Sequence, residues 1–190
     1  MSTKTEKLTF EAWLALPETR QRYEIVDGVL MMPPGPTPDH QWISRIIFRQ
    51  LDDFVEERNL GVVLYAPLDL LIQRSPLRTR QPDILYLSVE RTGISGRAGL
   101  RGLQFLEVPP DLVVEVLSPS NTRRDVAGKL EDYRRIGVLE CWLVSPEAET
   151  IEVVGLSPEG TTSTGIFGID GSLQSPVLAD FTLQLREVFR

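Results

Sequence analysis

The chain has 190 residues, of which 42% are hydrophobic and 25% charged, values that are typical of a globular protein. Its formal net charge of −7 argues against a protein that coats nucleic acid through bulk attraction. A single cysteine (Cys141) and a single histidine (His40) exclude an internal disulfide and a zinc site built from several cysteines or histidines.

Signals for export or membrane insertion are missing from the sequence. No segment approaches the roughly 20 apolar residues that a membrane-spanning helix needs, and the N-terminal lysines are followed by no apolar segment of a signal peptide. We therefore expect a cytoplasmic protein without membrane contact. The length predicts a single domain over residues 1–190, with residues 1–7 as a disordered tail.

Helices and strands are predicted from hydrophobic periodicity, and their ends from turn and cap residues. Thr9 caps the first helix, Asp27-Gly28 forms a two-residue hairpin turn, and residues 118–121 form a turn that caps the last long helix. In chain order we predict a helix at 10–16, hairpin strands on either side of residues 27–28, a proline-rich loop at 31–39, an amphipathic helix at 39–58, strands at 62–65 and 68–72, an arginine-bearing loop at 74–80, a strand at 84–89, a mobile surface loop at 91–103, a strand at 112–117, a helix ending near 136, strands at 139–144 and 150–156, and further strands and turns that end in an amphipathic segment at 181–189. This order predicts an α/β fold, a mixed sheet with helices packed on it.

A glutamate interrupts the most apolar of the predicted strands. Side chains alternate between the two faces of a strand, and residues 112–117 are apolar on both faces except at Glu115. A carboxylate buried there costs several kcal/mol unless a cation or a metal ion pairs with it. For an isolated glutamate a structural salt bridge is the more common explanation, so Glu115 alone does not define a site.

Three further charged residues have both functional and structural explanations. Asp83 begins a predicted strand directly after Pro82, a position that is also common for turn residues. Glu24 lies in a strand whose alternation can simply place it in solvent. Lys129 is the only lysine outside the N-terminal tail, although an exposed ion pair with Asp125, four residues earlier on the same helix, would also explain it.

The order of these residues is more informative than any one of them. An aspartate opens one strand, a glutamate lies inside another about thirty residues later, and a unique lysine follows. Such a trio can bring two carboxylates and one ammonium group to a common sheet edge. With oxygen ligands only, a metal ion at this edge would be a hard cation such as Mg²⁺ or Mn²⁺.

The sequence resembles the PD-(D/E)XK, or restriction-endonuclease-like, superfamily, and within it the Uma-type endonuclease family. The resemblance covers about residues 8–155. It is carried, in this order, by Leu-Thr-Phe-Glu-Ala-Trp-Leu-Ala-Leu-Pro from residue 8, Arg-Tyr-Glu-Ile-Val-Asp-Gly from 22, Pro-Asp-His-Gln from 38, Gln-Pro-Asp-Ile from 81, Pro-Asp-Leu-Val-Val-Glu-Val-Leu-Ser-Pro-Ser from 110, residues 125–133, and Gly-Val-Leu-Glu-Cys-Trp-Leu-Val from 137.

The resemblance implies roles for these residues. It makes Asp83 and Glu115 the acids that bind Mg²⁺ or Mn²⁺, with the carbonyl of Val116 as a further candidate ligand, and it makes Glu24 an additional acid for a second ion or its waters. The superfamily's usual lysine position is Leu117 here, so the strict motif is broken. In the Uma-type family the lysine has moved to the next helix, which matches Lys129.

The resemblance thus implies metal-dependent hydrolysis of a phosphodiester in nucleic acid, with DNA as the expected substrate and a homodimer as the expected assembly. Arginines of the two predicted loops, among them Arg80, Arg97 and Arg101, are candidates for phosphate contacts. His40, Asp125 and Tyr133 are candidate accessory residues.

Two other functions remain open at this point. The acidic net charge and the broken lysine spacing favour a nuclease fold used as a binding module without catalysis. A glycoside hydrolase with paired carboxylates is the weaker alternative, because that chemistry needs no lysine and usually surrounds the site with aromatic residues, which make up only 7% of this chain.

Overall fold

The computed structural model describes residues 7–17 and 21–190. Most of the predicted N-terminal tail, residues 1–6, lies outside these ranges. Across the described residues, no helix combines the length and the hydropathy that crossing a bilayer would require.

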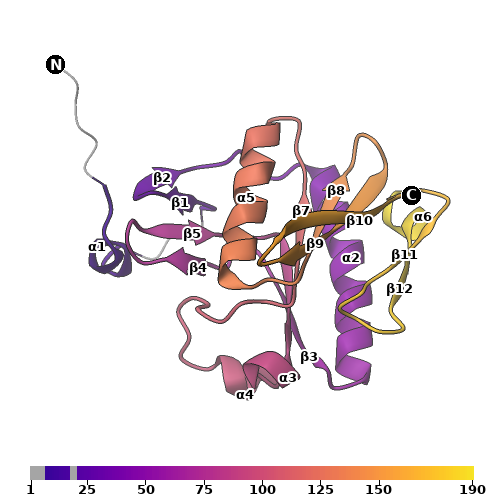
Figure 1. Ribbon diagram of the computed structural model, residues 1–190, viewed down its shortest axis with the longest axis horizontal. Coiled ribbons are helices and arrows are strands. Elements are labelled where there is room, and N and C mark those ends of the chain that lie inside the picture. The colour runs from indigo at the N-terminus through magenta and orange to yellow at the C-terminus, as the bar shows by residue number, and fades with distance from the viewer. Residues whose placement is uncertain (1–6, 18–20) are drawn as a thin grey trace.

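A mixed six-stranded sheet forms the centre of the structure, in the order β10-β9-β8-β7-β6-β3 (Figure 1). Its strands are β3 (Gly61–Tyr65), β6 (Ile84–Ser88), β7 (Leu112–Val116), β8 (Glu140–Ser145), β9 (Thr150–Ser157) and β10 (Gly160–Gly168). The β7–β8 pair is parallel, and every other neighbouring pair in this sheet is antiparallel. The prediction of a mixed sheet is confirmed.

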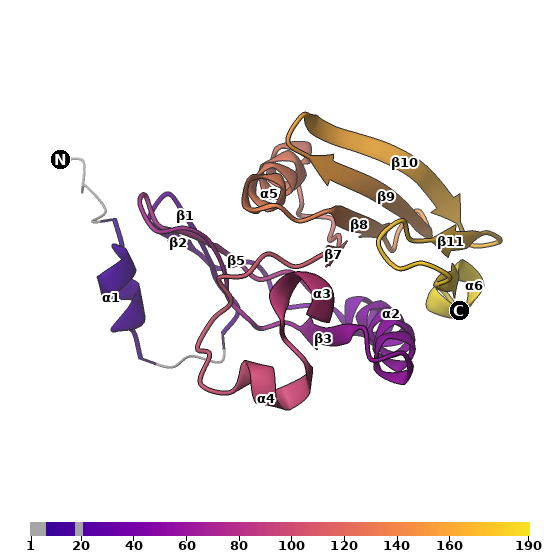
Figure 2. The ribbon, with the colours of Figure 1, turned by 60° about the horizontal axis from the view of Figure 1, so that its bottom comes forward.

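Two long helices cover opposite faces of the central strands (Figure 2). Helix α2 (Pro38–Glu57) begins at the cap Thr37 and buries an isoleucine-rich stripe against one face. Helix α5 (Arg123–Ile136) connects β7 to β8 and packs on the other face, where Tyr133 is fully buried. The two faces of β7 therefore contribute to two separate apolar clusters, and Glu115 points into the one beneath α5.

A second sheet carries the N-terminal hairpin, in the order β2-β1-β5-β4. It consists of β1 (Glu24–Val26), β2 (Val29–Met31), β4 (Leu70–Gln73) and β5 (Arg78–Arg80). Asp27 and Gly28 both have positive φ, 54° and 79°, as a type I′ turn requires, so the predicted hairpin turn is confirmed. This sheet brings β1 alongside the segment that leads into β6.

Three predictions of local structure were wrong. The predicted loop at 74–80 contains β5. This strand was missed because its sequence is polar, and its polar residues are tolerated in the interior because Arg80 pairs with buried carboxylates. The predicted loop at 91–103 overlaps helix α3 (Val89–Thr92) and contains helix α4 (Gly96–Leu100). Ser88 caps the start of α3, and Gly93, whose φ is 70°, caps its end. Helix α5 is capped by Thr122, in a capping box with Asp125, rather than by residues 118–121.

The remaining elements complete the ends of the chain. They are α1 (Phe10–Leu14), β11 (Ser172–Gln174), β12 (Thr182–Gln184) and α6 (Leu185–Val188). As predicted, Thr9 caps α1. The C-terminal segment, including β12 and α6, packs onto the same apolar cluster as α2.

A buried carboxylate fastens this C-terminal segment to the central sheet. Glu140 is 1% exposed, and its Oε1 accepts hydrogen bonds from Trp142 Nε1 at 2.6 Å and from Ser175 Oγ at 2.8 Å. Burial raises the pKa of Glu140 above its ordinary value, and these hydrogen bonds only partly offset that effect. The folded state therefore favours the protonated acid.

Glu140→Gln is expected to stabilise the protein at high pH and to have no stabilising effect at low pH. Because the folded pKa is raised, the wild-type stability due to protonated Glu140 is present below the ordinary glutamate pKa of about 4.3 and is lost as the pH rises through the folded value. The neutral amide does not lose this stability, so a higher unfolding free energy than that of the wild type is expected at pH 8, and the difference should vanish near pH 4. Urea titrations at both pH values measure this, with the exposed Glu147→Gln as control; a gain that is equal at both pH values would contradict it.

Candidate active site

Neighbouring strands bring two of the predicted acids to one edge of the central sheet. Asp83 directly precedes β6 and Glu115 lies in β7, the strand paired with β6. The Asp83 amide donates to the Val114 carbonyl at 3.1 Å, and the Val116 amide donates to Asp83 Oδ2 at 2.8 Å. The backbone of β7 thus fixes the Asp83 carboxylate beside the residue that follows Glu115.

Glu115 is 3% exposed and has two partners from α5. Lys129 Nζ lies 2.8 Å from Glu115 Oε2, and the Tyr133 hydroxyl donates to Oε1. Desolvation raises the pKa of Glu115; the Lys129 charge counteracts it, while the charges of Asp83 and Glu24 reinforce it. An additional cation at this position would therefore relieve an unfavourable concentration of negative charge.

Lys129 connects Glu115 to Glu24. Its Nζ lies 3.2 Å from Glu24 Oε1, on β1 of the second sheet. Burial alone would lower the pKa of Lys129, but the two carboxylates outweigh it and the pKa is raised. Burial likewise opposes ionisation of Glu24, but Lys129 and Arg80 together hold its pKa below the ordinary value. All four predicted catalytic residues, Glu24, Asp83, Glu115 and Lys129, therefore belong to one electrostatic cluster, and the alternative of an exposed Asp125–Lys129 pair does not describe Lys129.

Asp83 is also contacted from the solvent side of the cluster. Arg22 Nη1 lies 2.6 Å from Asp83 Oδ1, and His40 Nε2, at the start of α2, lies 3.4 Å from Oδ2. Burial would raise the pKa of Asp83, but the hydrogen bond with His40 and the charge of Arg22 reverse the effect, so the pKa is lowered. Arg22 had no predicted role, although it begins one of the sequence motifs, Arg-Tyr-Glu.

A network of buried ion pairs joins Glu24 of the cluster to Asp132 on α5 through Arg80. Asp132 on α5 is fully buried; its Oδ1 lies 3.0 Å from Arg78 Nη1, and its Oδ2 lies 2.7 Å from Arg80 Nη2. Arg80 Nη1 also lies 2.6 Å from Glu24 Oε2. The guanidinium of Arg80 is thus shared between two carboxylates and is only 7% exposed. This placement corrects its candidacy for phosphate binding and makes it a support for Glu24.

The remaining predicted residues fall into two groups. Tyr133 lies inside the cluster and contacts Glu115. Asp125 is exposed and caps α5 through Thr122, which explains its lowered pKa. Arg97 and Arg101 are exposed, in or next to α4, which lies at the bottom of Figure 1, away from β1 and α5. Their phosphate contacts remain a prediction.

The donor set at the sheet edge suits a hard divalent cation. Asp83 and Glu115 supply carboxylate oxygens, and the carbonyl of Val116 is expected on the Asp83 side of β7, because the N–H and C=O of one strand residue point the same way. Within residues 7–17 and 21–190, no three His, Cys, Asp or Glu side chains form a metal-ligand group. Mg²⁺ commonly uses only one or two carboxylates and keeps several waters, so two acids and a carbonyl fit it.

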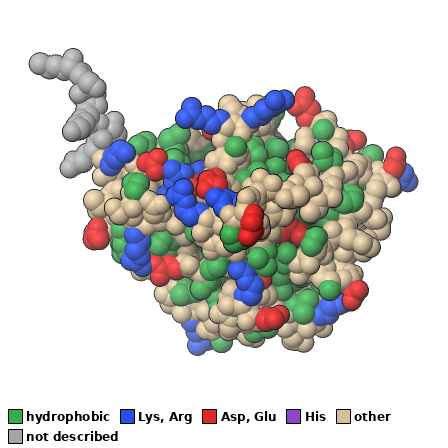
Figure 3. Space-filling model, in the orientation of Figure 1, with side chains coloured by type: hydrophobic (Ala, Val, Ile, Leu, Met, Phe, Trp, Pro, Cys, Tyr) green, Lys and Arg blue, Asp and Glu red, His purple; other side chains and the backbone are tan. Residues whose placement is uncertain are grey.

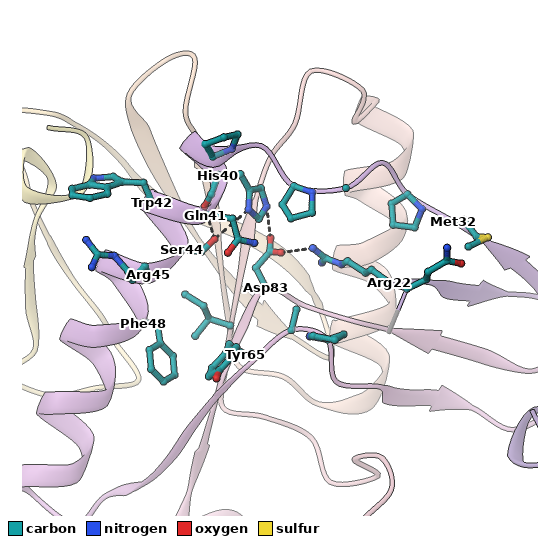
Figure 4. Close-up of a pocket in the computed structure, with 18 residues that line it drawn as sticks. Arg22, Met32, His40, Gln41, Trp42, Ser44, Arg45, Phe48, Tyr65 and Asp83 are labelled. Carbon is teal, nitrogen blue, oxygen red and sulfur yellow. Dashed lines mark hydrogen bonds and ion pairs between the residues drawn. The ribbon is translucent and has the colours of Figure 1, made fainter. Parts of the chain in front are cut away.

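An open cleft of about 1060 Å³ leads to Asp83 (Figure 4). Arg22 and His40 approach Asp83 from two sides of this cleft, and the first half of α2 forms one wall. A molecule in the cleft would therefore reach Asp83 first, while Glu115 lies deeper in the protein.

Comparisons with known proteins identify the fold and the family of the chain. A crystal structure described as a putative nuclease from Anabaena variabilis matches with a TM-score of 0.78 and 21% sequence identity, over 96% of this chain and 97% of that chain; at this identity the likeness shows the fold. No match is found among curated protein sequences. Residues 10–186 match the Uma2 family, described as "Putative restriction endonuclease". The predicted resemblance is confirmed, and the chain belongs to the Uma2 family.

Proposed function

We propose that the protein is a metal-dependent endonuclease that hydrolyses phosphodiester bonds of nucleic acid. The observation that carries the proposal is the placement of Lys129, the only lysine in residues 8–190, between the carboxylates of Glu115 and Glu24. Buried charge of this kind is costly for the fold. Glu115 also feels the charge of Asp83, which lines the cleft, and this arrangement fits a role in catalysis better than a role in stability alone.

Each residue of the cluster has a role that follows from its position. Asp83, Glu115 and the Val116 carbonyl would hold Mg²⁺ or Mn²⁺. When bound, the ion lowers the pKa of water and stabilises charge on the phosphate. Lys129 has three donors and needs only two for its glutamates, so the third can donate to an oxygen of the phosphate or of the attacking water. Glu24 orients Lys129, and Tyr133 holds Glu115 in place.

Arg22 has a role on the cleft side. Its guanidinium contacts Asp83 at 2.6 Å and the Gln81 carbonyl at 2.5 Å, and it lines the cleft. An arginine in this position can transfer a hydrogen bond from Asp83 to a substrate phosphate, because guanidinium groups bind phosphate well. The substrate would thereby free the Asp83 carboxylate for the cation.

The test is nicking of supercoiled plasmid in Mn²⁺, with EDTA and a Glu115→Ala protein as controls. Accumulation of the open circle in Mn²⁺ is expected, with loss of nicking in both controls. Mg²⁺ or Mn²⁺ should also raise the melting temperature of the wild-type protein, because a ligand that binds only the folded state stabilises it. The absence of both nicking and stabilisation by the ions would refute the proposal.

One observation favours a second function, a binding module without catalysis. The side chains of Arg22 and Lys129 already pair with Asp83 and Glu115, so cations of the chain itself partly compensate the two carboxylates. In that case nucleic acid would still bind, while Mg²⁺ and Mn²⁺ would leave the melting temperature unchanged.

A further inference from the structure

The cleft beside Asp83 has two aromatic side chains that face solvent. Trp42 on α2 is 46% exposed and Tyr65 at the end of β3 is 64% exposed, and both line the cleft. By contrast, Trp13 is 5% exposed and Trp142 is fully buried. Exposed rings that line a cleft are suited to stacking on planar ligands.

We propose that this cleft binds unpaired nucleotides, so that the substrate is a single strand, or a single-stranded part of a larger nucleic acid, rather than continuous duplex. This inference rests on the proposed nuclease function and specifies its substrate. Proteins that bind single strands without base-specific hydrogen bonds combine aromatic stacking platforms with a basic groove. The cleft supplies the aromatic part, and Arg22 and Arg45 are its basic side chains.

Each exposed ring is supported by a neighbour. The guanidinium carbon of Arg45 lies 4.5 Å from the centroid of the Trp42 ring, and Phe48 packs edge-on against Tyr65 with ring centroids 4.9 Å apart. Figure 4 shows Trp42 and Arg45 together at one side of the cleft and Phe48 near Tyr65 below Asp83. Each ring is thus contacted by one neighbour, and much of its surface still faces solvent.

The distribution of charge favours a single strand over a duplex. Binding to duplex DNA gains most of its affinity from lysines and arginines that neutralise many phosphates, whereas this chain has a net charge of −7. The α5 face of the molecule, which Figure 3 shows and which lies opposite α2, carries basic and acidic side chains interspersed, without a continuous basic band. In the cleft, Arg45 is a basic side chain, and Arg22 is paired with Asp83, so only one or two phosphates could be neutralised there.

The size of the cleft agrees with this assignment. Pockets that enclose a drug-sized ligand have volumes of roughly 300–1,000 Å³, and this cleft has about 1060 Å³. It can therefore accept a few unpaired nucleotides. Because Asp83 lines the same cleft, a strand held on the rings would present a phosphate to the catalytic cluster.

The experiment measures binding in EDTA, where no cleavage occurs. The probes are a labelled 12-nucleotide oligothymidine, the matching oligouridine, and the duplex of the first with its complement. Fluorescence anisotropy gives affinities, and the intrinsic tryptophan fluorescence reports stacking, since Trp42 is the one exposed tryptophan of the three in the chain. The variants are Trp42→Ala, Tyr65→Ala, the ring-preserving Trp42→Phe, and the control Ile166→Ala, whose side chain is 67% exposed on β10.

Tighter binding of either single strand than of the duplex is expected, with quenching of tryptophan fluorescence that Trp42→Phe abolishes. Trp42→Ala and Tyr65→Ala should each weaken binding by roughly 10-fold or more, the effect of losing one base–aromatic stack. Trp42→Phe and Ile166→Ala should bind nearly as wild type. Equal or tighter binding of the duplex, or wild-type binding by Trp42→Ala, would overturn the inference. Single-strand binding with neither cleavage of the bound strand in Mn²⁺ nor stabilisation by the ions would refute the nuclease proposal and leave this assignment intact.

Discussion

Glu115→Gln is expected to lower the rate of metal-dependent cleavage by at least about 10³-fold and to abolish the rise in melting temperature caused by Mg²⁺. The amide keeps the shape of the side chain and still accepts a hydrogen bond from Tyr133, but it lacks the charge that would hold a divalent cation. A metal ion contributes several kcal/mol of charge stabilisation to the transition state, and each 1.36 kcal/mol corresponds to a factor of ten in rate.

Lys129→Met is expected to separate catalysis from metal binding. Removal of one preorganised donor to a developing charge typically lowers the rate roughly 10²–10³-fold. In this variant, however, Glu115 keeps its carboxylate and loses a competing cation, so stabilisation by Mg²⁺ should persist or increase. The two variants would thus show opposite metal responses at similarly low activity.

The measurements are initial rates of plasmid nicking and melting temperatures in EDTA and in Mg²⁺. Glu147→Gln is the matched control for Glu115→Gln, because Glu147 is exposed, in the turn between β8 and β9. Full activity in Glu115→Gln would remove Glu115 from the metal site. Loss of Mg²⁺ stabilisation in Lys129→Met would show that the lysine organises the site rather than the transition state.

The central part of the candidate site could be predicted because local patterns mark it. Alternation along residues 112–117 identifies Glu115 as a charge in a buried strand, and the use of arginine elsewhere singles out Lys129. The Asp-Gly turn and the amphipathic periodicity of α2 likewise depend on residues close together in sequence. Such features depend mainly on short-range geometry, so one sequence is sufficient to reveal them.

The supporting residues could not be predicted, because their partners are distant in sequence. Arg22 pairs with Asp83, 61 residues away, and Arg80 pairs with Asp132, 52 residues away. Before the fold is known, an arginine in a polar segment looks like a surface residue. A weak signal existed at Asp132, which directly precedes Tyr133 of the buried stripe of α5.

The same reason explains the error at β5. A strand of Arg-Thr-Arg has no apolar alternation, and its arginines are acceptable in the interior only because Asp132 and Glu24 lie opposite them. The strand and its ion network therefore depend on each other, and only the complete fold contains both.

Asp132→Ala is expected to cause the largest loss of stability among single substitutions in this network. Asp132 is fully buried and accepts hydrogen bonds from Arg78 at 3.0 Å and from Arg80 Nε at 2.8 Å. Removing one partner of a buried ion pair leaves uncompensated charge and costs about 3–5 kcal/mol. For a chain of this size the corresponding fall in melting temperature is roughly 6–20 °C, measured by thermal denaturation in EDTA.

The matched control is Asp170→Ala, which removes an exposed aspartate paired with Arg186. An exposed ion pair contributes only about 0–1 kcal/mol, so this variant should melt close to the wild type. Equal melting temperatures for the two variants would show that the buried network contributes nothing special. Because Arg80 connects Asp132 to Glu24, and Glu24 orients Lys129, Asp132→Ala should also lower cleavage below its melting temperature. The network would then stabilise the fold and position the lysine through the same arginine.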